Sequence, residues 1–178
     1  MSRALALVIL IGILNSASIG LIGPIYPIFV TNRLAGSLSD VGLLYAIFYL
    51  SSAFLKIITG KLSDIYGRQK VFLLGAFLGA IATFGYTLAS NVIHLSILEF
   101  LNGTAFAFER PALLALTVDL SRPENLGLNF GLLDSATDLI IALTSLLVAI
   151  IVGLFDISYL FYICSGLQAM SGFLVLRR

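Results

Sequence analysis

The feature that most constrains this chain is the length of its charge-free apolar stretches. Residues 4–32, 71–98 and 157–176 contain no Asp, Glu, Lys or Arg. A run of about 18 or more apolar residues is long enough for a helix to cross the hydrocarbon core of a bilayer. Only 11% of the residues are charged, whereas soluble domains carry about 25%. The composition therefore predicts a protein that crosses a membrane several times.

Charged residues, glycines and prolines divide the chain into segments of helical length. The sequence predicts six transmembrane helices, near residues 4–30, 41–58, 71–89, 93–118, 128–153 and 157–176. In lipid, apolar runs of this length satisfy their backbone hydrogen bonds as helices rather than as the shorter alternating strands of a barrel. We therefore expect an all-α membrane protein, with one six-helix bundle over residues 1–178. Helix bends are expected at Gly23, Pro24 and Pro27, and at Pro111, because proline removes a backbone donor.

The basic residues predict the orientation of the bundle. The segments on the side of the N-terminus hold Arg3, Lys61, Arg68, Lys70, Arg122, Arg177 and Arg178, and those on the other side hold only Arg33. Because cytoplasmic loops carry an excess of Lys and Arg, both termini are expected to be cytoplasmic.

The densest cluster of charge is the stretch GKLSDIYGRQK, residues 60–70. A phosphate-binding loop would need a different glycine spacing and a preceding strand. An ordinary cytoplasmic loop would explain the basic residues, but not Asp64 or the two glycines.

A resemblance offers a third interpretation. The pattern Gly60-x-Leu62-x-Asp64-x-x-Gly67-Arg68-x-Lys70 resembles the signature loop between the second and third helices of the major facilitator superfamily, with Gln69 in place of a basic residue. Gly20-x-x-Gly23-Pro24-x-x-Pro27 is similar to the end of the first helix in drug-exporter-like members. The resemblance covers nearly the whole chain. It implies the first six-helix half of a twelve-helix transporter, built as two inverted three-helix repeats.

The resemblance also implies a gating role for this loop. Asp64 would dock on a helix N-terminus in the other half, and Arg68 would pair with Asp119 at the end of the fourth helix. A carboxylate at an exposed helix N-terminus gains about 0.3–1 kcal/mol, which can bias a two-state equilibrium and still break in every cycle. A separate second half or a second copy of the chain would supply the partner of Asp64. Otherwise the contact has no function here.

Ionisable residues inside the predicted helices are candidate functional sites, because each is expensive to bury. We expect Arg110, Asp134 and Asp138 to form a buried network that serves ion coupling or a cationic substrate. The alternative is a structural ion cluster that joins two helices. Asp134 and Asp138 lie one turn apart and would repel each other without a cation or a shared proton. Glu109, at a similar depth, is a further candidate for coupling or substrate binding, and Glu99 and Asn15 are candidates to line a cavity.

The sequence contains no paired Cys/His ligand set, nucleophile elbow or nucleotide-binding loop. We therefore expect no enzyme activity, cofactor, metal or nucleic-acid partner. The predicted function is secondary active transport of a small solute by alternating access across the cell membrane. The chain would act as a half-carrier that needs a second six-helix half or a homodimer. The alternative is a truncated remnant that does not transport, or a membrane-assembly protein.

Overall fold

The computed structural model describes residues 3–154 and 156–176, and this part of the chain forms long helices joined by short turns. The elements are α1 (Arg3–Ile28), the π-helical turn η1 (Phe29–Arg33), α2 (Leu38–Tyr66), α3 (Arg68–Tyr86), α4 (Val92–Leu120), the 3₁₀ turn η2 (Pro123–Asn125), α5 (Leu126–Ile151) and α6 (Ile157–Val175). The all-helical architecture is confirmed, and each predicted segment overlaps one of the six long helices. Arg177 and Arg178, which the charge bias included, lie outside the described residues.

Most of these helices suit a bilayer by length and composition. Five are long and apolar enough to cross a membrane: α1 with η1, α2, α3, α5 with η2, and α6. The remaining helix, α4, is 29 residues long but carries several charged residues. Two of them, Glu99 and Glu109, are only 5% exposed and lie inside the bundle. The chain is therefore a multi-pass membrane protein whose most polar helix turns buried carboxyl groups inward.

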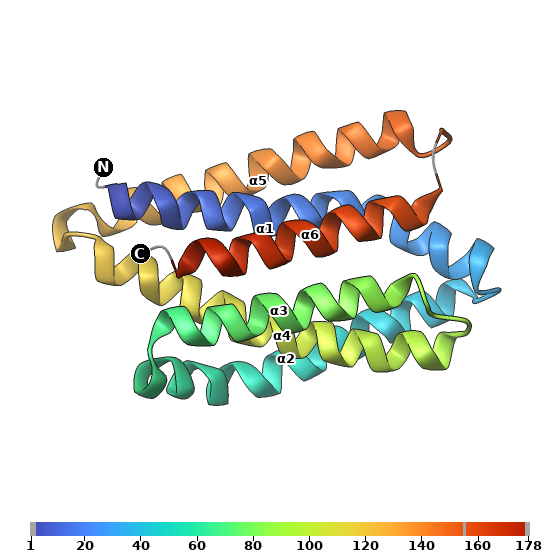
Figure 1. Cartoon of the computed structure of the whole chain (residues 1–178), viewed down its shortest axis with the longest axis horizontal. Helices are drawn as coiled ribbons and strands as arrows, with labels where there is room; N and C mark the ends of the chain where they lie inside the picture. The colour runs from blue at the N-terminus through green and yellow to red at the C-terminus, as the bar shows by residue number, and fades with distance from the viewer. Residues whose placement is uncertain (1–2, 155, 177–178) are drawn as a thin grey trace.

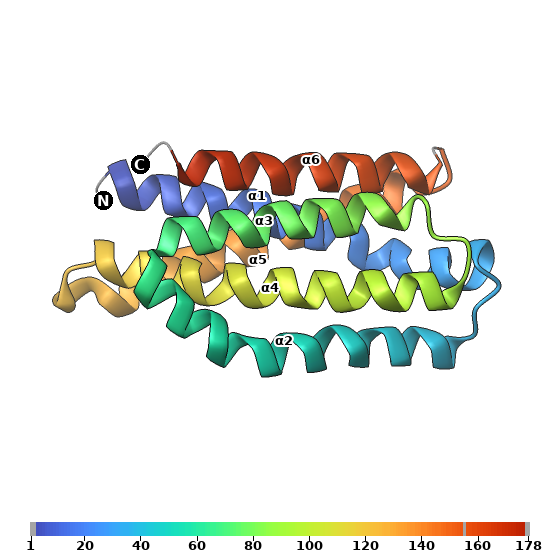
Figure 2. The same cartoon turned by 60° about the horizontal axis from the view of Figure 1, so that its bottom comes forward.

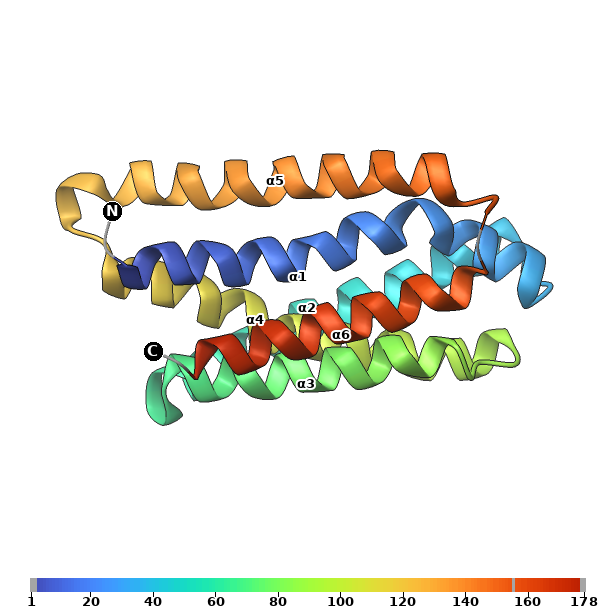
Figure 3. The ribbon, with the colours of Figure 1, turned by 45° about the horizontal axis from the view of Figure 1, so that its top comes forward.

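The helices run side by side along the long axis of the molecule (Figure 1). They form two groups of three, in which α1 packs on α5 and α6, and α4 packs on α2 and α3. Contact between α3 and α6 joins the groups, while α5 and α2 lie on the outside (Figures 2 and 3). The first helix begins and the last helix ends at the same end of the bundle, where α2 also passes into α3 (Figure 1).

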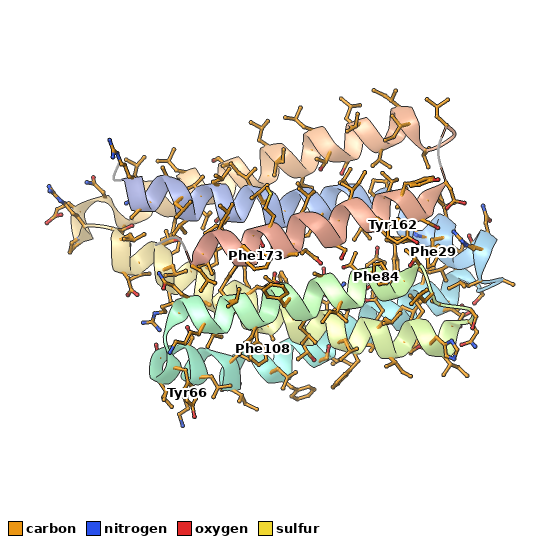
Figure 4. All side chains as sticks on the ribbon, viewed as in Figure 1. Phe29, Tyr66, Phe84, Phe108, Tyr162 and Phe173 are labelled. Atoms are coloured by element: carbon orange, nitrogen blue, oxygen red, sulfur yellow. The ribbon has the colours of Figure 1, made fainter. Side chains whose placement is uncertain are left out.

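At the interface between α3 and α6 the two helices approach closely, and aromatic rings contact each other. A Cβ added to Gly172 would lie 3.0 Å from the Cβ of Ala76, so the two helices approach closely at this point. Elsewhere in the same interface, the ring centroids of Phe84 and Tyr162 lie 5.6 Å apart (Figure 4). Small residues at helix crossings allow this kind of packing in membranes.

Pro24 does not end α1, but it leaves one carbonyl of the helix without its donor. In an α-helix the N–H of residue 24 would bond the carbonyl of Gly20, and proline has no N–H. The hydroxyl of Ser145 on α5 donates to that carbonyl instead, at 3.0 Å. Contact is close here, because a Cβ on Gly20 would lie 2.6 Å from the backbone oxygen of Ile141. The proline and the glycine therefore fix how α1 meets α5.

Pro111 has the same consequence in α4. It leaves the carbonyl of Ala107 without a helical donor, and the hydroxyl of Thr59 on α2 donates to this oxygen at 2.5 Å. Thr59 is 1% exposed and Ala107 is fully buried. A hydroxyl from a neighbouring helix thus satisfies each of the two carbonyls.

The turn between α2 and α3 is shorter than the loop predicted over residues 60–70. Helix α2 continues to Tyr66, and α3 begins at Arg68. Gly67 alone breaks the helix, with φ of +96°, a conformation that glycine adopts at no steric cost. Charge alone predicts that the helix ends before residue 60, but charged residues at the end of a membrane helix can stay helical because their side chains reach water.

Candidate functional site

A cavity of about 310 Å³ lies between α1, α2 and α4, with further contributions from α3 and α6. Most of its wall is apolar or aromatic, and the polar members are Asn15, Ser18, Tyr26, Tyr45, Tyr49, Tyr86, Glu99, Asn102, Glu109 and Gln168. Binding sites for small molecules are usually cavities of roughly 300–1,000 Å³ with a few convergent polar groups in a mainly apolar wall. The three candidates Asn15, Glu99 and Glu109 from the sequence all line this cavity.

Tyrosine and amide side chains surround Glu99 in one part of the cavity. The hydroxyl of Tyr86 donates to Glu99 Oε1 at 2.8 Å, and the amide of Asn102 donates to the Tyr86 hydroxyl at 2.8 Å. Tyr26 lies close enough to the same carboxylate to interact with it electrostatically. Its hydroxyl is buried and has no partner in hydrogen-bonding geometry among the described residues. We call Tyr26, Tyr45, Tyr86, Glu99 and Asn102 the tyrosine subsite.

A second group of polar side chains surrounds Glu109, ten residues further along α4. The amide of Asn15 on α1 donates to Glu109 Oε2. The opposite carboxyl oxygen lies against α3, since a Cβ on Gly79 would be 3.2 Å from Glu109 Oε1. Gln168 on α6 accepts a hydrogen bond from Thr83 at 3.0 Å. We call Asn15, Glu109 and Gln168 the amide subsite.

Neither Glu99 nor Glu109 forms an ion pair with any residue that the structure describes. An unpaired carboxylate ion is very costly in a low-dielectric interior. Each carboxyl group must therefore carry a proton or face a bound cation.

Sequence reasoning did not identify the tyrosines, Asn102 or Gln168. Asn102 lies three residues after Glu99 and therefore on the same side of α4, a spacing that could have identified it. Tyr26 and Tyr86 come from two other helices, and no spacing along the chain connects them with Glu99.

The predicted network of Arg110, Asp134 and Asp138 is only partly assembled. Arg110 Nη2 lies 3.3 Å from Asp134 Oδ1, so α4 and α5 are joined by an ion pair. The two side chains are 35% and 57% exposed, at the surface of the bundle rather than buried inside it. Asp138 is exposed on α5, and it takes part in none of the ion pairs formed by the described residues.

The charge cluster at the α2–α3 turn brings three helices together. Arg68 on α3 pairs with Asp64 on α2, and its Nε lies 3.2 Å from Asp119 Oδ2 on α4. Leu62 packs against the nearby apolar core. Gly60 and Lys70 differ from these residues, since a Cβ on Gly60 would meet nothing within 4 Å and Lys70 is exposed.

The opposite end of the bundle carries an ion pair that the sequence did not reveal. Arg33, at the end of η1, lies 3.2 Å from Asp156, which caps the N-terminus of α6. The hydroxyl and backbone N–H of Ser158, together with the Arg33 guanidinium, hold the pKa of Asp156 below its usual value. This contact joins the end of the first helix to the start of the last.

Comparison with known proteins agrees with the helical membrane architecture described above. The model of the Major Facilitator Superfamily matches residues 8–178. The chain is 28% identical over 153 residues to the uncharacterized MFS-type transporter MJ1560 of Methanocaldococcus jannaschii, a match that covers 86% of this chain and 39% of that protein. It is also 28% identical over 118 residues to the quinolone resistance protein NorA of Staphylococcus aureus, covering 66% of this chain and 30% of that protein. The matches thus span about two fifths or less of each relative. By the extent of the family match, the chain belongs to the Major Facilitator Superfamily of membrane transporters.

Proposed function

We propose that this chain transports a small solute by secondary active transport with alternating access, as one six-helix half of a carrier in the cell membrane. The observation that carries the proposal is the cavity of about 310 Å³, which holds two buried carboxyl groups without a cationic partner in the described chain. Ionisable groups that face the interior of a membrane bundle typically mark substrate or ion pathways. The charge bias of the sequence supports cytoplasmic termini.

The proposal includes two inverted three-helix repeats, and two features support it. Exchanging α1 with α4, α2 with α5, and α3 with α6 maps the main helix contacts onto one another, since α1 packs on α5 and α6 while α4 packs on α2 and α3. Pro24 and Pro111 lie late in α1 and α4. Their freed carbonyls accept hydroxyls from α5 and α2, which the same exchange relates.

The proposal also includes a second bundle, either another half or a second copy. Asp134 and Asp138 lie more than two turns inside α5, and both are exposed. A carboxyl group at that depth is costly in lipid. Protein or an aqueous path must therefore cover this face of α5, and a facing bundle would provide either.

Access from both sides of the membrane can be tested with a single cysteine. In a Cys164→Ala background, Asn102→Cys would place a thiol in the cavity, and a membrane-impermeant thiol reagent would be added to either side of oriented vesicles. Alternating access predicts labelling from both sides. The wild-type protein is the control, because its only cysteine, Cys164, is buried and should stay unlabelled. Labelling of the Asn102→Cys protein from one side alone would contradict alternating access.

The second bundle can be tested by crosslinking and flux. Ala142→Cys places a thiol one turn from Asp138 on the exposed face of α5, and Ile81→Cys serves as the control on the exposed face of α3. We expect a crosslinked product for Ala142→Cys only. Proteoliposomes would then be assayed with labelled sugars, carboxylates and amines. A strictly monomeric chain without flux would favour the non-transporting remnant.

A further inference from the structure

We propose that the tyrosine subsite binds a protonated amino group of the solute, and that it prefers an amine with N–H donors to a quaternary ammonium ion. The inference rests on the proposed function in one respect, because it takes the cavity to be the solute site. Charge, aromatic rings and hydrogen-bonding capacity each support it.

The charge comes from Glu99, which is 5% exposed and has no ion pair within the described chain. A bound cation would neutralise this carboxylate where no protein cation does. The rings of Tyr26, Tyr45 and Tyr86 adjoin it, with centroid distances of 5.5 Å from Tyr26 to Tyr45 and 6.0 Å from Tyr26 to Tyr86. Tyrosine faces attract cations within about 6 Å. A carboxylate beside three tyrosines is thus a setting for a positively charged nitrogen.

The hydrogen bonds distinguish between kinds of cation. The Tyr86 hydroxyl already donates to Glu99 Oε1 and accepts from Asn102. The Tyr26 hydroxyl belongs to a side chain that is 3% exposed, lines the cavity and has no partner in hydrogen-bonding geometry among the described residues. Buried polar groups without a partner are rare and costly. An N–H donor placed between Tyr26 and the carboxylate would give both oxygens a bond, whereas a quaternary ammonium has no donor to offer.

The amide subsite lacks these features. Glu109 accepts its hydrogen bond from the amide of Asn15 rather than from a tyrosine, and the amide of Gln168 lies close to its other carboxyl oxygen. The two buried carboxyl groups of α4, Glu99 and Glu109, therefore have different surroundings. We expect Glu99, beside the tyrosines, to be the one that recognises the amine.

Binding can be measured without transport, because the chain has seven tyrosines and no tryptophan. Four of those tyrosines line the cavity: Tyr26, Tyr45, Tyr49 and Tyr86. The tyrosine fluorescence of the purified protein in detergent would be titrated with 2-cyclohexylethylamine, its N-trimethylated derivative and 2-cyclohexylethanol. These probes share an apolar body and differ in charge and donors. Because a hydrogen bond to a charged group contributes about 1.5–3 kcal/mol, the amine should bind at least about tenfold more tightly than the other two.

Three variants decide the assignment. Glu99→Gln should weaken amine binding at least about tenfold, and Glu124→Gln, the control at an exposed carboxyl group of η2 outside the cavity, should leave it unchanged. Tyr26→Phe should remove the preference for the amine over its trimethylated derivative while both still bind. Equal binding of all three probes to the wild type would overturn the inference, as would unchanged amine binding in Glu99→Gln. If circular dichroism shows that Glu99→Gln does not fold, Tyr26→Phe decides alone, and an undiminished preference for the amine refutes the assignment.

The outcomes separate this inference from the proposed function. Amine selectivity in detergent by a strictly monomeric chain that gives no flux in proteoliposomes would contradict transport and leave the subsite intact. Flux of a solute by a protein that shows no amine selectivity would contradict the subsite and leave transport intact.

Discussion

Thr59→Val tests whether the Thr59 hydroxyl replaces the donor that Pro111 removes from α4. Valine has nearly the shape of threonine, so the substitution removes the hydroxyl and little else. In the native structure that hydroxyl donates to the carbonyl of Ala107 at 2.5 Å. The hydroxyl also lies 3.3 Å from the carbonyl of Lys56 on its own helix, a longer contact to an oxygen that already has a helical donor.

The expected loss of stability follows from the burial of the carbonyl. Thr59 is 1% exposed and Ala107 fully buried, so water cannot replace the lost bond. A buried polar group without a partner costs about 1–3 kcal/mol, while hydrogen bonds between membrane helices average about 0.6 kcal/mol and reach about 1.7. Because Pro111 cannot donate to the carbonyl of Ala107, we expect a loss near the top of the membrane range, about 1–2 kcal/mol.

The assay is a double-mutant cycle with Pro111→Ala, followed by circular dichroism during unfolding in mixed micelles. Alanine restores the N–H that bonds the carbonyl of Ala107, so Thr59→Val should then cost less than about 0.6 kcal/mol. Thr104→Val is the control, because the Thr104 hydroxyl donates to the carbonyl of Phe100 on the same exposed stretch of α4, at 2.8 Å. An equal cost of Thr59→Val in the wild-type and Pro111→Ala backgrounds would refute the reasoning.

Three further predictions can use the same unfolding assay. A Cβ on Gly103 would collide with the backbone of Phe48 on α2, so Gly103→Ala should destabilise the protein by about 1–3 kcal/mol, whereas Gly131→Ala, which meets nothing within 4 Å, should not. Gly67→Ala should cost about 1–3 kcal/mol, because its φ of +96° disfavours a side chain; an unchanged midpoint would contradict this. The pKa of Asp156 lies below the usual 3.8, so its contribution to stability is present above that value and is lost as the pH falls through the lowered pKa of the folded state. In the Asp156→Asn variant, stability should therefore fall less as the pH is lowered through this range. An unchanged pH dependence of stability in the variant would contradict the role given to Asp156.

The helices of this protein could be predicted from sequence because lipid leaves a long apolar segment few other options. The end of α2 could not be predicted in the same way. The charges of Lys61 and Asp64 predict a loop, yet both residues lie within a helix that runs to Tyr66. Only Gly67 has a backbone conformation that ends the helix, and one sequence does not show which glycine has a positive φ.

The cavity could be predicted only in part, for a geometric reason. Glu109 and Arg110 are neighbours in sequence but point about 100° apart around the helix, so one lies inside the bundle and the other pairs with Asp134 at its surface. Which of them faces inward depends on how α4 packs against α2 and α3. The meeting of Tyr26 with Glu99 depends likewise on tertiary packing.

The carbonyls freed by Pro24 and Pro111 bear on the order in which the bundle assembles as the chain enters the membrane. The donor for Ala107 lies 48 residues earlier in the chain, so α2 is already in place when α4 is made. The donor for Gly20 lies 125 residues later, so α1 must wait for α5 before its carbonyl is bonded. The hydrogen bond between α2 and α4 can thus form as soon as α4 enters the membrane, whereas the hydrogen bond between α1 and α5 can form only later. Of the six long helices, α1 precedes the others in the chain, yet it is among the last to reach its final hydrogen bonding.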